Sequence, residues 1–252
     1  MKTNSNSYTI VYAAVLVVIV AFLLAFVFQA LRPAQEANVA LDKQKQILYS
    51  LNIRGLQDQA AAAKYKEVVT ADEIIDANGN VVDKGSKGGT AAGFKLNSGD
   101  FKAGKLAVYV CNVDGQTKYV IPVYGMGLWG PISGYIALND DKSTIYGAYF
   151  NHESETAGLG AEIKDSQAWQ EKFIGKNIWD EKGDVVLSIV KKVDDAATQV
   201  DCVTGATLTS NGVDAMIKDG MKKVKDFATG KLLEGTANSD STTVVEPKVE
   251  EE

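Results

Sequence analysis

Four hydroxyl side chains lie within seven residues of the segment Asp201–Ser210, namely Thr204, Thr207, Thr209 and Ser210. An amphipathic helix is predicted to begin near Gly212, and either of the last two hydroxyls can cap it. A cap explains one hydroxyl but not four. Free N–H groups and the dipole at a helix start favour a phosphate, and Gly205 lets the backbone approach it closely. A Thr oxygen at this place can also become the ester oxygen of a phosphate, but the pattern does not choose among the hydroxyls.

Two glycine-containing segments upstream could face such a site. The segment His152–Gly160 is a surface loop in its simplest interpretation, but Gly158-Leu159-Gly160 could let the backbone lie along a flat ligand, with Leu159 against a ring. The segment Gly125–Ile132 is, in its simplest interpretation, a bend that buries Trp129 in the core. Otherwise it offers Leu128 and Trp129 as an apolar wall for an aromatic cofactor.

The composition excludes several other classes of site. One His and two Cys are too few for a zinc or iron–sulfur site made by this chain alone, and too few for a disulfide scaffold. Cys111 and Cys202 are distant in sequence and either pair or stay free. We expect no metal site and, without a nucleophile–base pair, no hydrolase chemistry. A net charge of −6 with 26 scattered Lys and Arg argues against a nucleic-acid partner.

The elements that position these segments begin with an apolar run from Tyr8 to Leu31, which contains no charged residue. About 24 residues at a rise of 1.5 Å span ~36 Å, enough to cross a hydrocarbon core of roughly 30 Å. Tyr8 and Tyr12 lie at one end, as interfacial aromatic residues do, and Arg32-Pro33 closes the other. We predict an uncleaved transmembrane helix. A cleaved signal peptide is the alternative, but the run is longer than a signal h-region and no small-x-small motif stands out before Arg32.

Helices and a hairpin are predicted for the part that follows the anchor. Apolar spacing indicates helix over 34–51 and again over 60–69, with a break at Gly55. Asn-Gly between apolar pairs indicates a hairpin over 74–82. The residues 83–100 are rich in Gly, Ser, Lys and Asp, so we expect a loop that can be mobile.

Strands dominate the next part, and the fold class that follows is α+β. The predicted strands cover 106–113, 118–124, 135–138, 144–150 and 185–193. Asp165 or Ser166 can cap a short helix that buries Trp169 and Phe173 and stops at Gly175. The last helix has one apolar face, formed by Val213, Met216, Ile217, Met221, Val224 and Phe227. We expect a twisted, mainly antiparallel sheet from all these strands, with helices packed on it.

The anchor and three motifs together resemble the C subunits of the bacterial Na+-translocating NADH:quinone oxidoreductases. The motifs are GMGLWGPI from Gly125, ETAGLG from Glu155 and DCVTGAT from Asp201, and the resemblance runs from the anchor to about Leu233. Ala157 departs from the pattern, because the loop usually has Pro there, and this puts the rigidity of the loop in doubt. The related Rnf-type electron-transport complexes have a similar G subunit. The GLWGPI element and the insertion at 70–100 favour the family of C subunits.

The resemblance implies a covalent flavin and its attachment residue. Thr207 would carry FMN through a phosphoester bond, and Asp201 matches the acidic position that the attaching flavin transferase needs. Further cofactor-binding positions are implied around the phosphate at Thr204, Gly205, Ala206, Leu208 and Thr209. Glu155 and Thr156 are implied as further cofactor-binding positions. The Gly and apolar content near the motif suggests that Gly158, Leu159, Gly160, Leu128 and Trp129 lie near the flavin ring.

The implied function is that of a membrane-anchored flavoprotein subunit which relays electrons within a six-subunit complex. That complex oxidises NADH, reduces ubiquinone and pumps Na+ across the bacterial inner membrane, with the domain of this subunit on the periplasmic side. This chain would bind neither NADH nor quinone, in agreement with the lack of a G-x-G-x-x-G motif between a strand and a helix. The alternatives are the Rnf-type G subunit and a tethered extracytoplasmic binding domain without a redox role.

The resemblance also implies a division of the chain. It comprises an N-terminal tail at 1–7, the transmembrane helix at 8–31, a helical connection and the N-terminal part of the extracytoplasmic domain at 32–100, the FMN-binding domain at 101–234 and a disordered acidic tail at 235–252.

Overall fold

The computed structural model describes residues 5–229, and their first element is a single long helix, α1 (Asn6–Ser50). The predicted transmembrane helix and the helix predicted after it are therefore one element. Pro33 lies inside it and does not end it. Proline removes one backbone hydrogen bond from a helix, a loss that long apolar helices tolerate. The predicted acidic tail at 235–252 lies outside the described residues.

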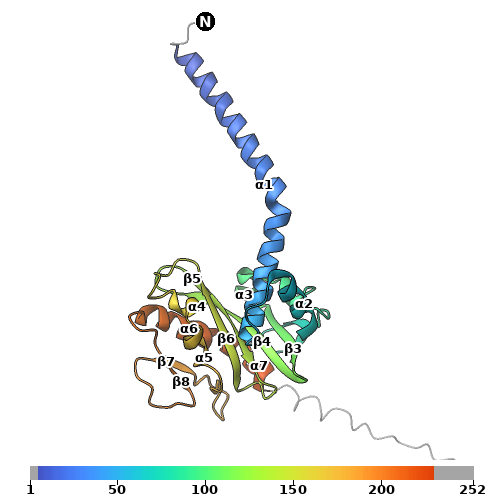
Figure 1. Cartoon of the computed structure of the whole chain (residues 1–252), viewed down its shortest axis with the longest axis vertical. Helices are drawn as coiled ribbons and strands as arrows, with labels where there is room; N and C mark the ends of the chain where they lie inside the picture. The colour runs from blue at the N-terminus through green and yellow to red at the C-terminus, as the bar shows by residue number, and fades with distance from the viewer. Residues whose placement is uncertain (1–4, 230–252) are drawn as a thin grey trace, which may run out of the picture. The chain divides into compact units, whose positions relative to one another are not determined.

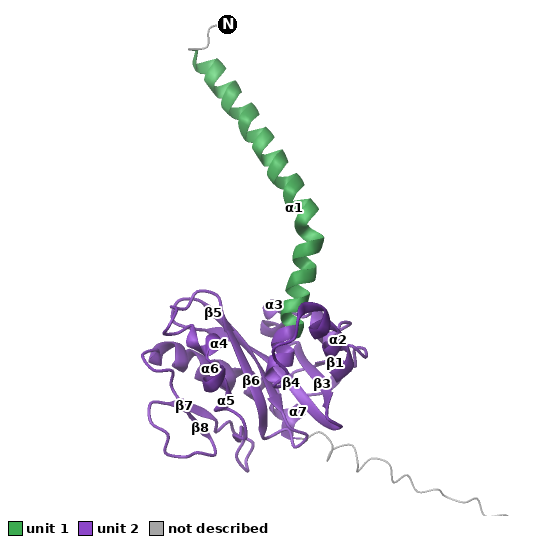
Figure 2. Ribbon diagram, viewed as in Figure 1, with its two compact units in different colours: residues 1–44 green, residues 45–252 purple. Residues whose placement is uncertain are grey.

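The chain divides into two compact units, residues 1–44 and 45–252 (Figure 2). The first unit contains most of α1. Its most apolar window has a mean hydropathy of 3.2, and among residues 5–229 only α1 is long and apolar enough to cross a membrane. The large apolar side chains from Ile10 to Leu31 are all exposed, so no protein surface covers them in the described part of the chain.

A six-stranded antiparallel sheet forms the framework of the second unit, in the order β2-β1-β3-β4-β5-β6. Figure 1 labels four of its strands, β3 to β6. The strands are β1 (Val69–Ile75), β2 (Val81–Asp83), β3 (Leu106–Val113), β4 (Gln116–Met126), β5 (Pro131–Leu138) and β6 (Ile145–His152). Both predicted hairpins are present, at β1–β2 and β3–β4. The sheet and its helices confirm the α+β fold class.

Alternation along the strands sends apolar side chains into two separate cores. Val108 and Ile136 point to one face, where they belong to the same core as Val213 and Ile217 of α6 (Thr207–Lys223). Their neighbours on the same strands face the other way, toward the end of α1 and toward α2 (Asp58–Val68), and include Tyr109. Each fully buried aliphatic side chain contributes about 1.5–3 kcal/mol, so the two cores fix the register of every strand.

Short helices complete the second unit. They are η1 (Gly93–Lys95), α3 (Ser98–Lys102), α4 (Glu162–Asp165), α5 (Gln167–Glu171) and α7 (Lys225–Thr229). Ser166 caps α5 by accepting a hydrogen bond from the N–H of Trp169 at 3.3 Å, which confirms one of the two predicted caps. Both Trp169 and Phe173 are buried as predicted, although α5 ends at Glu171, before Gly175.

The prediction of a sheet strand over 185–193 is wrong. Only Ser188–Val190 forms a strand, β7, and it pairs in parallel with β8 (Gln199–Asp201) in a separate two-stranded sheet. The earlier residues pair elsewhere, because Val185 bridges Trp179 and the N–H of Val186 donates to the carbonyl of Ile178 at 2.8 Å. Apolar β-rich composition gave the strand signal but could not identify the partner.

The loop predicted over 83–100 follows a defined path around a buried carboxylate that the prediction did not anticipate. Asp72 is fully buried in β1. It accepts hydrogen bonds from the N–H groups of Ser86 at 3.0 Å, Ala92 at 2.7 Å and Phe94 at 3.1 Å. One side chain therefore accepts hydrogen bonds from three loop amides and holds the loop against the sheet.

Candidate functional site

A serine hydrogen bond and a glycine with positive φ shape the turn before α6. The Oγ of Ser210 accepts a hydrogen bond from the N–H of Val203 at 3.0 Å, and Gly205 adopts a φ of +77°. The helix starts at Thr207, earlier than predicted. Within the described chain, no side chain caps its N-terminus, so the predicted capping by Thr209 or Ser210 is wrong. The first amides of a 17-residue helix are left without a side-chain partner.

Burial separates the four hydroxyls into two pairs. Thr209 is 2% exposed and Ser210 is fully buried, and each makes a hydrogen bond inside the protein. Thr204 is exposed and Thr207 is half-buried as the first residue of α6. Only the second pair can meet an incoming phosphate donor without local unfolding.

The carboxylate of Glu155 joins two of the predicted segments. Its Oε1 accepts a hydrogen bond from the N–H of Trp129 at 2.8 Å, and its Oε2 accepts one from the hydroxyl of Thr209 at 2.6 Å. Burial opposes the charge, but these bonds, together with those from the N–H groups of Leu128 and Gly130, hold the pKa of Glu155 below its usual range. The side chain is therefore ionised at neutral pH.

Glycines let these segments approach one another. A Cβ at Gly160 would lie 2.5 Å from Oε2 of Glu155 and 2.6 Å from Oγ1 of Thr209. A Cβ at Gly127 would lie 2.4 Å from Oε1 of the same carboxylate. These distances allow only glycine. We expected Gly158 to Gly160 to give a flat ligand access to the backbone, but the space at Gly160 is taken by protein atoms.

Five large apolar side chains on these segments are exposed, and we call them the apolar cluster. They are Met126, Leu128, Trp129, Leu159 and Leu208, between 44% and 67% exposed. The interpretation that buries Trp129 in the core is wrong, because its side chain is the most exposed of the five. Leu159 lies against the turn before α6, since a Cβ at Gly205 would be 2.9 Å from its Cδ2. The structure thus brings all three predicted segments together, and Met126 is the member that the sequence analysis missed.

Asp201 lies at the end of β8, just before the turn. Both of its carboxylate oxygens accept from Nζ of Lys172, at 2.9 and 2.7 Å, and both side chains are 44% exposed. Its carbonyl accepts a hydrogen bond from Nε1 of Trp169 at 2.8 Å. The carboxylate is held in place yet remains exposed to solvent. The ion pair with Lys172 gave no signal in the sequence, because the two residues are far apart along the chain.

The remaining candidate groups have structural explanations. Nδ1 of His152 accepts a hydrogen bond from the N–H of Glu155 at 3.2 Å. Cys111 is buried and Cys202 half-buried, and both are free, which settles the question of pairing. Among residues 5–229, no group of three or more His, Cys, Asp or Glu side chains could hold a metal ion.

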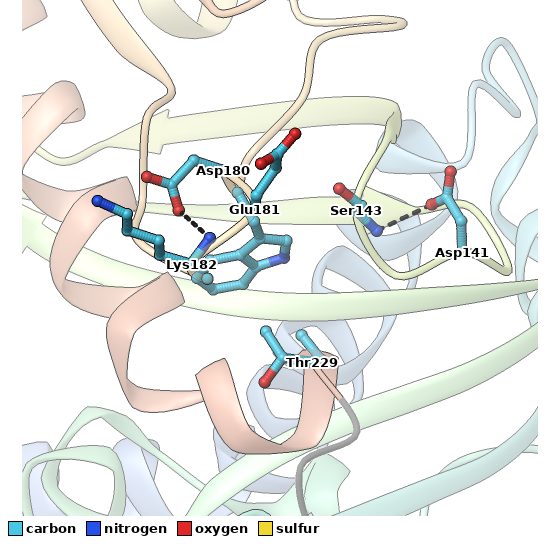
Figure 3. A pocket seen from close by; sticks show the side chains of 9 residues that line it. Asp141, Ser143, Asp180, Glu181, Lys182 and Thr229 are labelled. Carbon is cyan, nitrogen blue, oxygen red and sulfur yellow. Dashed lines mark hydrogen bonds between the residues drawn. The ribbon is translucent and has the colours of Figure 1, made fainter.

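A cavity of about 380 Å³ lies apart from these segments, beside the end of α7 (Figure 3). It is lined by Asp141, Ser143, Trp179, Asp180, Glu181, Lys182, Gly183, Ala228 and Thr229. Asp141 and Asp180 turn their oxygens to the backbone N–H groups of Ser143 at 2.8 Å and Lys182 at 2.9 Å. None of the residues predicted to bind a cofactor lines this cavity, so we do not assign it to the site.

Comparison with known proteins places these segments in one family domain. The FMN-binding domain family matches residues 127–222, which include His152–Gly160, Asp201–Ser210 and all but the first two residues of Gly125–Ile132. The chain is similar to the C subunit of the Na(+)-translocating NADH-quinone reductase of Pseudomonas aeruginosa, with 31% identity over 86% of this chain and 94% of that protein. The same protein of Haemophilus ducreyi is 33% identical over 85% of this chain and 89% of its own length.

A solved structure shares the fold. The crystal structure of the corresponding Na(+)-translocating NADH-quinone reductase protein from Parabacteroides distasonis, also a C subunit, matches with a TM-score of 0.72 and 36% identity. The match covers 79% of this chain and 97% of the other. The likeness therefore extends beyond the three motifs to most of the second unit.

Proposed function

Because the chain belongs to the family of the C subunits of Na(+)-translocating NADH-quinone reductases, we propose that it carries FMN as a phosphoester on Thr207 and relays electrons within that complex. The chain is a membrane-anchored flavoprotein subunit of this translocase, takes FMN as its cofactor and assembles with the other subunits. The covalent link, the relay, the attaching enzyme and the periplasmic location of the second unit belong to the proposal. We prefer this function to that of the Rnf-type G subunit and to that of a domain without a redox role.

The start of α6 carries the proposal. The phosphate of FMN would accept hydrogen bonds from the uncapped first amides of the helix, where the dipole also favours negative charge. Of the two accessible hydroxyls, Thr207 belongs to the first helical turn, whereas Thr204 precedes Gly205. Thr207 is also the residue that the family motif identifies as the attachment residue.

Thr209 takes a different role from the one first expected. Its hydroxyl donates a hydrogen bond to Glu155, so in this proposal the side chain supports the loop and only the backbone N–H would face the phosphate. Thr204, which is exposed on the other side of Gly205, remains available to the phosphate.

The apolar cluster would receive the ring of the flavin. Trp129 and Leu159 are exposed on separate loops that Glu155 and Thr209 hold together, and Leu208 adjoins the attachment residue. Covering exposed apolar surface contributes about 25 cal/mol per Å², which would hold the ring against the protein between electron transfers. FMN supplies the redox chemistry, and the chain supplies its position and electrostatic surroundings.

Attachment needs a modifying enzyme and an activated donor. Oγ1 of Thr207 would form a bond to the phosphorus of an FMN phosphoanhydride such as FAD. The anhydride P–O bond breaks, AMP leaves, and the hydroxyl proton passes to a base of the flavin transferase. The half-exposed carboxylate of Asp201, held by Lys172, offers that enzyme a fixed charge three residues before Thr204.

In-gel fluorescence tests the attachment. The full chain is co-expressed with a flavin transferase, denatured and viewed under ultraviolet light. We expect a fluorescent band for the wild type and for Thr204→Ala, which removes the other accessible hydroxyl, and none for Thr207→Ala. A dark wild-type band, or a fluorescent Thr207→Ala band, would contradict the proposal.

A further inference from the structure

Glu155 has an arrangement that neither a surface loop nor a ligand contact explains. The residue is 7% exposed, although its neighbours Glu153 and Ser154 are exposed. Each oxygen is used by a different segment: Oε1 by the bend that carries Trp129, and Oε2 by the first turn of α6 through Thr209. A buried charge is costly unless it is hydrogen-bonded, and here both oxygens of the carboxylate accept hydrogen bonds from protein donors.

The glycines around Glu155 show that the fit is close on both sides. A Cβ at Gly127 or at Gly160 would come within 2.5 Å of one carboxylate oxygen or the other. The bend, the loop and the helix start therefore cannot shift relative to one another without breaking a hydrogen bond to a charged group.

We infer that Glu155 is a positioning residue, which fixes the apolar cluster relative to Thr207 and places one negative charge beside the flavin. The inference rests on the proposed function, because it concerns the site of the flavin attached there. Both oxygens of Glu155 are turned to protein donors, so its role would be to position the site and not to contact the cofactor directly. It differs in this from the cofactor contact that the sequence analysis expected of it.

Two substitutions separate the geometric role from the electrostatic one. In Glu155→Ala every hydrogen bond to the carboxylate is lost, including those from Trp129 and Thr209. In Glu155→Gln the amide oxygen can still accept from the N–H of Trp129, and the amide nitrogen can donate to the hydroxyl of Thr209, while the charge is gone. Glu153→Gln is the matched control, because it removes the same charge from an exposed position two residues earlier.

The geometric role is measured first in the full chain expressed without a flavin transferase. Hydrogen exchange of the amides at 128–130 should be faster in Glu155→Ala and close to wild type in Glu155→Gln. In the flavin-loaded chain, the fluorescence anisotropy of the flavin should fall in Glu155→Ala and recover in Glu155→Gln. Unchanged exchange and anisotropy in Glu155→Ala would overturn the positioning role.

The electrostatic role is measured by redox titration of the flavin-loaded full chain. A fixed negative charge opposes the addition of an electron nearby, so the midpoint potential should rise in Glu155→Gln and stay at the wild-type value in Glu153→Gln. Equal potentials in Glu155→Gln and the wild type would overturn this role. If the wild type carries no flavin, the proposed function fails, and the exchange measurement still decides whether Glu155 fixes the bend.

Discussion

Replacing Gly160 by alanine should destabilise the second unit through a specific collision. The added Cβ would meet Oε2 of Glu155 at 2.5 Å and Oγ1 of Thr209 at 2.6 Å. Both residues are buried, and the hydroxyl of Thr209 donates a hydrogen bond to Oε2 of Glu155 at 2.6 Å. Neither atom can move away without losing that hydrogen bond. A hydrogen bond to a charged group contributes about 1.5–3 kcal/mol and overpacking costs about 1–3 kcal/mol. Since the two effects overlap, we expect a loss of about 2–4 kcal/mol in the free energy of unfolding.

Thermal unfolding of the full chain in detergent measures this loss. The fluorescence of Trp169 and Trp179, which are buried in the second unit, reports its unfolding without interference from α1. For a domain of this size, each kcal/mol lowers Tm by about 2–4 °C, so Gly160→Ala should unfold about 4–16 °C below the wild type.

Gly158→Ala is the matched control in the same loop. Gly158 has a φ of +72°, and among residues 5–229 nothing lies within 4 Å of an added Cβ, so the substitution costs only the left-handed conformation, about 1–2 kcal/mol. A Tm for Gly160→Ala equal to or above that of Gly158→Ala would refute the reasoning that the packing around Glu155 requires a glycine.

Three further predictions concern the carboxylates that hold loops in place. Thr209→Val keeps the shape of the side chain but removes the 2.6 Å bond to Glu155, so urea unfolding at pH 7 should show a loss of about 1.5–3 kcal/mol; an unchanged midpoint would contradict the bond. The pKa of Glu155 is lower in the folded than in the unfolded chain, so its stabilisation is present above the unfolded value of about 4.3 and is lost as the pH falls through the folded pKa. Urea unfolding across this pH range should therefore show a smaller loss of stability on acidification in Glu155→Gln than in the wild type, and equal losses would refute the assignment. Asp72→Asn replaces one of the two accepting oxygens by an NH2 group, which cannot accept a hydrogen bond from a backbone N–H. Hydrogen exchange should therefore accelerate at Ser86 if Oδ1 is replaced, or at Ala92 and Phe94 if Oδ2 is replaced; unchanged protection at all three would contradict the role of Asp72.

The sequence predicted the sheet well, because its signals are local. Alternation along Leu106–Val113 and the Asp-Gly turn that follows specify a hairpin without knowledge of the rest of the chain. The strand expected at 185–193 failed for the opposite reason. Its residues pair with Trp179, Ile178 and β8. A local sequence pattern does not indicate which distant segment a short apolar strand will pair with.

The candidate site was predicted by its segments more than by the roles of its residues. Hydroxyl and glycine content located the segment Asp201–Ser210 and the two loops, and the structure brings all three together. The burial of Thr209 and Ser210 could not be read from composition, because it depends on Glu155 and Val203 as partners. Similarly, Gly160 suggested flexibility, whereas the structure uses it for the space that a side chain would fill.

Peptide mass spectrometry of the full chain, co-expressed with a flavin transferase, tests the central claim most directly. Cleavage after Lys192 and Lys218 releases one peptide that holds Thr198 and all four hydroxyls of the segment Thr204–Ser210. We predict that this peptide has gained the mass of FMN less one water, and that fragmentation assigns the added mass to Thr207. An unmodified peptide, or FMN on Thr204 or any other residue, would contradict the account.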